Sequence, residues 1–123
     1  MSRITVLVVE PEKKPYVKEI DNTLESLQRE VGGYIQAIYP FEEPAAIVCA
    51  ECAKLEGMPL NRALRDENGE IYDIIAGTFL IVGLGEDNFG TVREEYIQRF
   101  AEVFRVPEVF INFDGGIIAV EME

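Results

Sequence analysis

The chain has 123 residues, of which 48% are hydrophobic and 28% are charged, and this length predicts a single globular domain. Its formal net charge of −12 comes from 23 acidic and 11 basic residues without a histidine, which disfavours direct binding to a nucleic-acid backbone. No apolar run approaches the roughly 18 residues that a membrane span requires, and no secretion signal is visible. We therefore expect a cytoplasmic domain over residues 1–123 that contacts neither nucleic acid nor membranes directly.

The first third of the chain predicts two strands and a helix. Residues 3–10 are rich in valine and isoleucine and predict a strand that is buried on both faces, and residues 15–20 predict a second, shorter strand. Asn22 and Glu25 are spaced as a capping box, so we expect a helix over residues 23–31. A pair of glycines follows and ends this helix, because glycine readily takes the left-handed conformation.

The next segment predicts two strands, over residues 34–41 and 45–49, joined across a turn-like break. The motif Cys-Ala-Glu-Cys, formed by Cys49 and Cys52, ends this segment. A thioredoxin-like redox pair would open a helix after a strand, and no helix signal follows the motif. A zinc site would require two further ligands, and the sequence has no histidine and no third cysteine. We therefore interpret both cysteines as structural thiols.

The most unusual stretch is PLNRALRDENGEIYDIIAGTF, residues 59–79, in which two arginines precede an acidic turn and an apolar run. Pro59 favours a helical turn over residues 60–66. Such a turn would place Arg62 and Arg65, three positions apart, on one face. We expect these two arginines to lie at the rim of the main concave site.

The rest of the chain predicts four strands and a second helix. Asn68-Gly69 is a strong turn signal ahead of the first of these strands. Thr91 and Glu94 are spaced as another capping box, and aromatic residues then recur at helical spacing and predict a core-facing stripe. The four strands cover residues 70–76, 78–83, 108–113 and 117–122, with a hairpin turn between the last two. Together these signals predict an α+β domain with one mixed or mainly antiparallel sheet and two principal helices, over residues 23–31 and 91–105.

The candidate ligand-binding residues are Asn61, Arg62, Arg65, Tyr72 and Asp73. Arginine presents a planar fork of donors to carboxylate or phosphate and keeps its charge when it is partly buried. Asn61 adds a donor and an acceptor, while Tyr72 and Asp73 lie just beyond the turn. The alternative is a local structural role, in which the arginines pair with neighbouring carboxylates and contribute at most about 1 kcal/mol.

Signals for catalysis are sparse. Without histidine the chain can form neither a Ser-His-Asp nor a Cys-His arrangement, and it lacks the commonest general base. Gly83-Leu84-Gly85 lacks the third glycine of a dinucleotide fingerprint, and the acidic residues that follow it would repel a phosphate. We predict no catalytic residue, no cofactor and no metal.

Three segments resemble a family of small uncharacterised proteins that is described only as a domain of unknown function. They are VLVVEP, VGGYIQAIYPFEEPAAIVC and PLNRALRDENGEIYDIIAGTFLIVG, and the likeness covers about residues 3–85. The resemblance implies occurrence in bacterial genomes, on plasmids and in phages. It implies no activity and therefore no catalytic residues.

Three hypotheses for function follow. The leading one is a non-enzymatic accessory or binding protein of mobile-element origin that engages a protein partner or a small anionic ligand. It depends on the absence of a recognisable set of catalytic residues and on the segment that contains Arg62 and Arg65. The second is an acidic decoy that imitates nucleic acid and occupies the binding site of a host enzyme, which depends on the net charge. The third is an enzyme that works without histidine.

Overall fold

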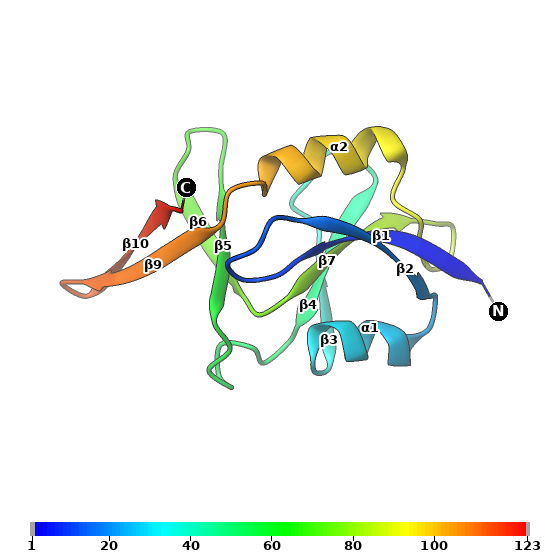
Figure 1. Ribbon diagram of the computed structural model, residues 1–123, viewed down its shortest axis with the longest axis horizontal. Coiled ribbons are helices and arrows are strands. Elements are labelled where there is room, and N and C mark those ends of the chain that lie inside the picture. Colours follow the sequence, from blue (N-terminus) through cyan, green and yellow to red (C-terminus); the bar gives the residue numbers. More distant parts are fainter. Residues whose placement is uncertain (1, 123) are drawn as a thin grey trace.

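The computed structural model describes residues 2–122, and within that range it contains ten strands and two helices (Figure 1). The helices are α1 (Leu24–Val31) and α2 (Glu94–Val103). The strands are β1 (Arg3–Val9), β2 (Tyr16–Asp21), β3 (Ile35–Ile38), β4 (Ala45–Ala50), β5 (Leu60–Arg65), β6 (Ile71–Ala76), β7 (Phe79–Leu84), β8 (Phe89–Gly90), β9 (Glu108–Phe113) and β10 (Gly116–Glu121). The predicted α+β class and antiparallel pairing are confirmed, but the strands form three separate sheets where the sequence predicted one.

The largest sheet has the strand order β2-β1-β7-β4-β3, and β8 pairs with β7 at its side. Successive side chains point to opposite faces of a strand, so an apolar run can serve two cores. In β1, Val6 and Val8 belong to one buried cluster and Leu7 and Val9 belong to another. Helix α1 packs on the first face, whereas α2 and the β5–β6 hairpin cover the second (Figure 1). The prediction that this strand is buried on both faces is confirmed.

Helix α1 begins one residue later than predicted and uses a different cap. The side chain of Thr23 accepts a hydrogen bond from the backbone N–H of Ser26 at 3.1 Å. Asn22 was predicted to be the cap, but its side chain instead donates to the carbonyl of Phe89 at 3.0 Å. The helix ends at Gly32 with φ 81°, as the glycine pair predicted.

Helix α2 begins after Arg93 without a side-chain cap, so the second predicted capping box was wrong. The hydroxyl of Thr91 accepts a hydrogen bond from the backbone N–H of Thr5 at 3.0 Å, which ties the helix approach to β1. Within the predicted aromatic stripe, Phe100 and Phe104 are buried. Val103 also lies at the helical spacing of this stripe, but it is 63% exposed and not part of the core.

The predicted helical turn over residues 60–66 was also wrong, because these residues form strand β5. β5 pairs with β6 in a hairpin whose register shifts between Leu60 and Arg62. The apolar strand β6 requires a backbone partner, and a helical turn would have left its N–H and C=O groups unpaired. The predicted turn at Asn68-Gly69 is confirmed, with φ 80° at Gly69 and a hydrogen bond from Gly69 N–H to Asp66 O at 2.9 Å.

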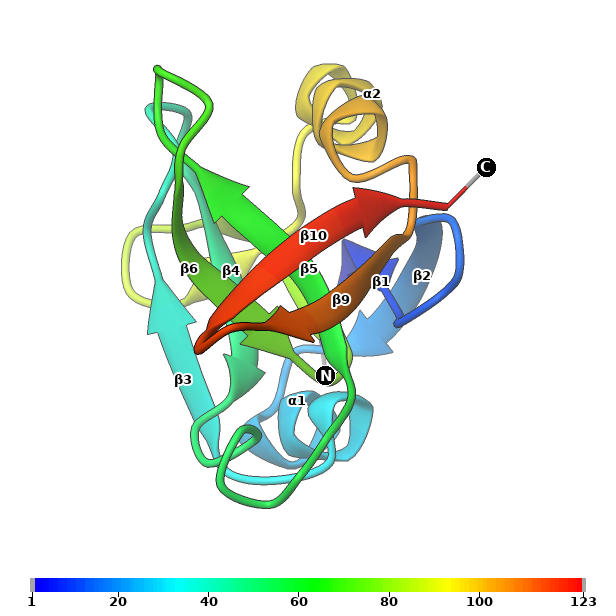
Figure 2. The same cartoon turned by 90° about the vertical axis from the view of Figure 1, so that its left-hand side faces the viewer.

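The final two strands form a hairpin that is a separate two-stranded sheet, with six consecutive residue pairs and no register shift. Asp114 and Gly115 have φ values of 46° and 84°, as a tight hairpin turn requires. Figure 2 shows this hairpin as an outer layer that crosses over β5. No helix within residues 2–122 is long and apolar enough to cross a membrane.

Candidate functional site

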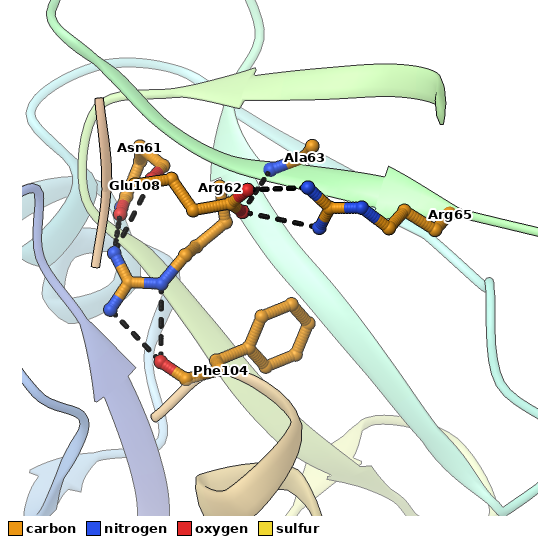
Figure 3. Close-up of polar contacts among 6 residues, drawn as sticks. All are labelled: Asn61, Arg62, Ala63, Arg65, Phe104 and Glu108. Atoms are coloured by element: carbon orange, nitrogen blue, oxygen red, sulfur yellow. Dashed lines mark hydrogen bonds and ion pairs between the residues drawn. The ribbon is translucent and has the colours of Figure 1, made fainter. Parts of the chain in front are cut away.

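Arg62 is almost completely buried, with 1% of its surface exposed. Its guanidinium donates twice to the carbonyl of Phe104, from Nε at 3.1 Å and from Nη2 at 2.9 Å. Nη1 donates to the backbone and side-chain oxygens of Asn61 at 3.3 and 2.8 Å (Figure 3). Nη2 also donates to the carbonyl of Lys13 at 2.7 Å. Arginine has five N–H donors, and all five are therefore used inside the protein.

Two effects act on the pKa of Arg62 in opposite directions. Burial lowers the pKa of its guanidinium, while the Glu108 carboxylate acts in the opposite direction. The ordinary pKa of arginine is so high that the side chain still carries its charge. Arg62 therefore serves as a buried cationic brace, and it has no free donor for a ligand.

Asn61 is buried to the same degree, with 0% exposed. Its amide nitrogen donates to the carbonyls of Val9 at 2.9 Å and Gly77 at 2.8 Å, and its side-chain oxygen accepts from Arg62. These bonds hold β5 against the end of β1 and the turn between β6 and β7. The structure thus places Asn61 and Arg62 in the interior, away from the surface that a ligand could reach.

Arg65 lies in a different environment, because 38% of its side chain is exposed. It forms a two-pronged ion pair with Glu108, with Nη2–Oε2 at 2.6 Å and Nη1–Oε1 at 3.4 Å (Figure 3). Glu108 also accepts a hydrogen bond from the backbone N–H of Ala63 at 3.0 Å and is 6% exposed. The hydrogen bond with Glu108 raises the pKa of Arg65, although burial opposes it. Arg65 keeps three further N–H donors that the carboxylate does not use.

Glu108 was missed by sequence reasoning. It lies 43 positions from Arg65 in the chain, so no local spacing connects the two residues. The available signal was weak: a carboxylate at the start of a strand that is otherwise mainly apolar.

A groove lies between α2 and the β5–β6 hairpin, and we call it the α2 groove. It has a volume of about 410 Å³ and is lined by residues that include Phe41, Leu64, Arg65, Tyr72, Arg99 and Phe100. Its lining combines aromatic and aliphatic side chains with two arginines, three glutamates and Tyr72, which is 57% exposed. Apolar and polar groups that converge in one concavity are typical of ligand sites.

A second arginine reaches the α2 groove from the helix. Arg99 pairs with Glu43 at 2.8 Å, and its side chain is 66% exposed. The groove therefore contains two arginines from different elements, and each of them is bound to a carboxylate through part of its donor set. Only Arg65 was predicted, because Arg99 is 34 positions further along the chain.

Asp73 lies apart from the α2 groove. It pairs with Lys54 at 2.9 Å beside a second pocket of about 370 Å³, which also contacts Cys49 and Cys52. Cys49 is buried and Cys52 is exposed, and neither forms a disulfide. Burial raises the pKa of the Cys49 thiol, which disfavours its reactive thiolate form. Among residues 2–122, no group of three or more Asp, Glu, Cys or His side chains is arranged to hold a metal ion.

The five predicted residues thus fall into three places: Arg65 and Tyr72 in the groove, Asn61 and Arg62 in the interior, and Asp73 at the second pocket. Over residues 4–105 the chain matches the family described as Domain of unknown function (DUF3846). The chain belongs to this family. The resemblance seen in the sequence is confirmed, and the match extends about 20 residues further, through α2. The family region includes both walls of the groove and ends before Glu108.

No curated protein and no solved structure shows a significant match to the chain.

Proposed function

We propose that this protein is a non-enzymatic accessory or binding protein whose α2 groove holds a small ligand with an anionic group beside an apolar body. The observation that carries the proposal is Arg65, which is fixed in the groove by Glu108 and still has unused N–H donors. A guanidinium that is already held in place loses little further freedom when it binds an oxyanion.

The charges of the groove are compatible with such a ligand. Three glutamates and two arginines line the groove. Glu108 is bound to Arg65 and to a backbone N–H, and Glu43 is bound to Arg99, so two of the three carboxylates are compensated, while Glu42 is exposed to solvent. Half-buried Phe41 packs on the buried Phe100, with ring centroids 4.2 Å apart, and contributes an apolar side chain to the groove lining. An anion with an aromatic or aliphatic body would match both features.

The chemistry of the lining supports binding in preference to covalent catalysis. The groove residues include no serine, threonine or cysteine, and the chain has no histidine. A serine, threonine or cysteine nucleophile activated by a histidine therefore has no candidate in the groove.

A thermal-shift screen with organic anions tests the proposal, for example benzoate, phenyl phosphate, acylated amino acids and nucleoside monophosphates. A ligand at 100 times its Kd should stabilise the protein by about 2.7 kcal/mol. Arg99→Gln should weaken binding of the best anion about tenfold or more, because a charge-assisted hydrogen bond contributes about 1.5–3 kcal/mol. Arg65→Gln should weaken it at least as strongly.

The matched control is Arg93→Gln. Arg93 lies just before α2, is paired with a glutamate and is 68% exposed, which is close to the 66% of Arg99, but it does not line the groove. Its substitution should leave affinity unchanged. The proposal fails if no anion stabilises the wild-type protein, or if the Arg99 and Arg93 variants bind equally well.

A further inference from the structure

The outer face of the β9–β10 hairpin is made entirely of apolar side chains. Residues paired across an antiparallel hairpin point to the same face, and Ile111 pairs with Ile118 while Val109 pairs with Val120. The alternate face carries Glu108 and Phe110, which lie toward β5. The side chains on the outer face are 41–64% exposed and are Val109, Ile111, Phe113, Ile118 and Val120.

Such a face is unusual for an element that contacts water. Antiparallel sheets with one solvated side normally alternate apolar residues inward with polar residues outward. Here the alternation is absent, because the outward positions of β9 and β10 hold valine, isoleucine and phenylalanine. A two-stranded sheet is marginally stable by itself, and a contiguous exposed apolar patch marks an interaction site.

The hairpin is separate from the region that defines the family. The family match ends at residue 105, and β9 begins at Glu108. Figure 2 shows the hairpin as the outermost layer of the molecule, in front of β5. The α2 groove uses Glu108 from its inner face and none of the outer side chains. The outer face is therefore free to contact another molecule.

The negative charge around the hairpin favours a basic binding partner. Residues 106–122 contain no lysine or arginine and three acidic residues, of which Asp114 and Glu121 are exposed, whereas Glu108 is buried against Arg65. The whole chain carries a net charge of −12, so a second copy would bring the same sign to the contact. A protein surface bordered by basic residues would be attracted, since interfaces form between complementary potentials.

We propose that the outer face of β9–β10 docks a protein partner whose contact surface combines aliphatic or aromatic side chains with bordering lysine or arginine. The apolar face supplies the buried contact, and the acidic surroundings select a basic partner. This interaction does not depend on the α2 groove or on its ligand.

A phage-displayed library of random 12-residue peptides, selected on the immobilised wild-type protein, tests the proposal. The selected peptides should contain both basic and apolar residues. Their affinity for Ile111→Thr/Ile118→Thr should fall about tenfold or more, because threonine keeps the strand conformation but removes the apolar face. Binding should also weaken as sodium chloride rises from about 50 mM to about 500 mM, since salt screens attraction between opposite charges.

Leu55→Thr is the matched control, because Leu55 is 89% exposed and lies outside the hairpin. The selected peptides should bind this variant with the same affinity as the wild-type protein. Circular dichroism checks that each variant is folded, and Val120→Thr replaces the double variant if that protein unfolds. Neutral or acidic selected peptides, or equal binding by the outer-face variant, would overturn the proposal. A wild-type dimer in sedimentation analysis that the variant converts to a monomer would also overturn it, because the occupant would then be a second copy.

Discussion

Arg62 connects three segments that are far apart in the sequence, through carbonyls of Lys13, Asn61 and Phe104. Removing this guanidinium would take a donor from the buried carbonyls of Asn61 and Phe104 and from the partly buried carbonyl of Lys13, and an unmade buried hydrogen bond is costly. We expect Arg62→Ala to lower the free energy of unfolding by about 3–5 kcal/mol, as for other broken buried charge networks. Urea denaturation measures this change.

The control for this prediction is Arg105→Ala. Arg105 is 56% exposed and pairs with Glu102 at 3.4 Å on the surface, so its loss should change stability by less than about 0.5 kcal/mol. If Arg62→Ala costs no more than Arg105→Ala, the hydrogen bonds at Arg62 do not stabilise the fold as we infer.

Tyr16 provides a second test at the residue scale. A hydrogen bond with Glu10, together with partial burial and the negative charge of that carboxylate, raises the pKa of Tyr16 to about 12. Because the folded-state pKa lies above the ordinary value of 10.0, the resulting stabilisation is complete below pH 10 and is lost as the pH rises toward 12. Ultraviolet titration should show a late phenol that Tyr16→Phe removes.

Glu10→Gln tests whether Glu10 causes the raised pKa of Tyr16. It removes the charge and the carboxylate acceptor but leaves the ring in place, so the late phenol should titrate closer to 10. An unchanged late phenol in Glu10→Gln would show that Glu10 is not the cause of the raised pKa.

At the scale of elements, helix α1 depends on its N-terminal cap. The Thr23 hydroxyl satisfies one of the backbone N–H groups that a helix start leaves without a partner. We expect Thr23→Ala to lower the free energy of unfolding by about 1 kcal/mol. Thermal denaturation measures the loss, and Thr23→Ser, which keeps the hydroxyl, should recover most of it. A loss that serine does not recover would point to packing of the threonine methyl group.

Periodicity found most elements, since both helices and the strand-rich character follow from apolar spacing and glycine positions. It failed at β5, where Asn61 and Arg62 are consecutive and both buried. A regular strand would direct neighbouring side chains to opposite faces, and the register shift between Leu60 and Arg62 interrupts that alternation. The polar sequence of this segment therefore suggested a surface turn, although the side chains of Asn61 and Arg62 form hydrogen bonds in the interior.

At the scale of the whole molecule, the sequence could not predict how the strands combine. β1 pairs with β7, which lies 70 residues further along the chain, and local patterns carry no signal for such a pairing. The candidate site has the same difficulty, because Arg65 pairs with Glu108 and both line the groove together with Arg99. Residue type suggested Arg65 and Tyr72, but tertiary packing decided which of the predicted residues reach the surface.

The hairpin and the family region are joined through Glu108, so the hairpin contributes to stability as well as to the surface. Glu108→Ala would leave the backbone N–H of Ala63 without an acceptor and Arg65 without its ion pair. We expect a loss of about 2–3 kcal/mol in the free energy of unfolding, because the carboxylate is buried while Arg65 is partly solvated. Deletion of residues 107–123 removes the same carboxylate and should cost at least as much. Glu102→Ala, on the exposed side of α2, is the control and should change stability by less than about 0.5 kcal/mol. If the deletion is tolerated as well as Glu102→Ala, the family region folds without the hairpin, and Glu108 does not brace it.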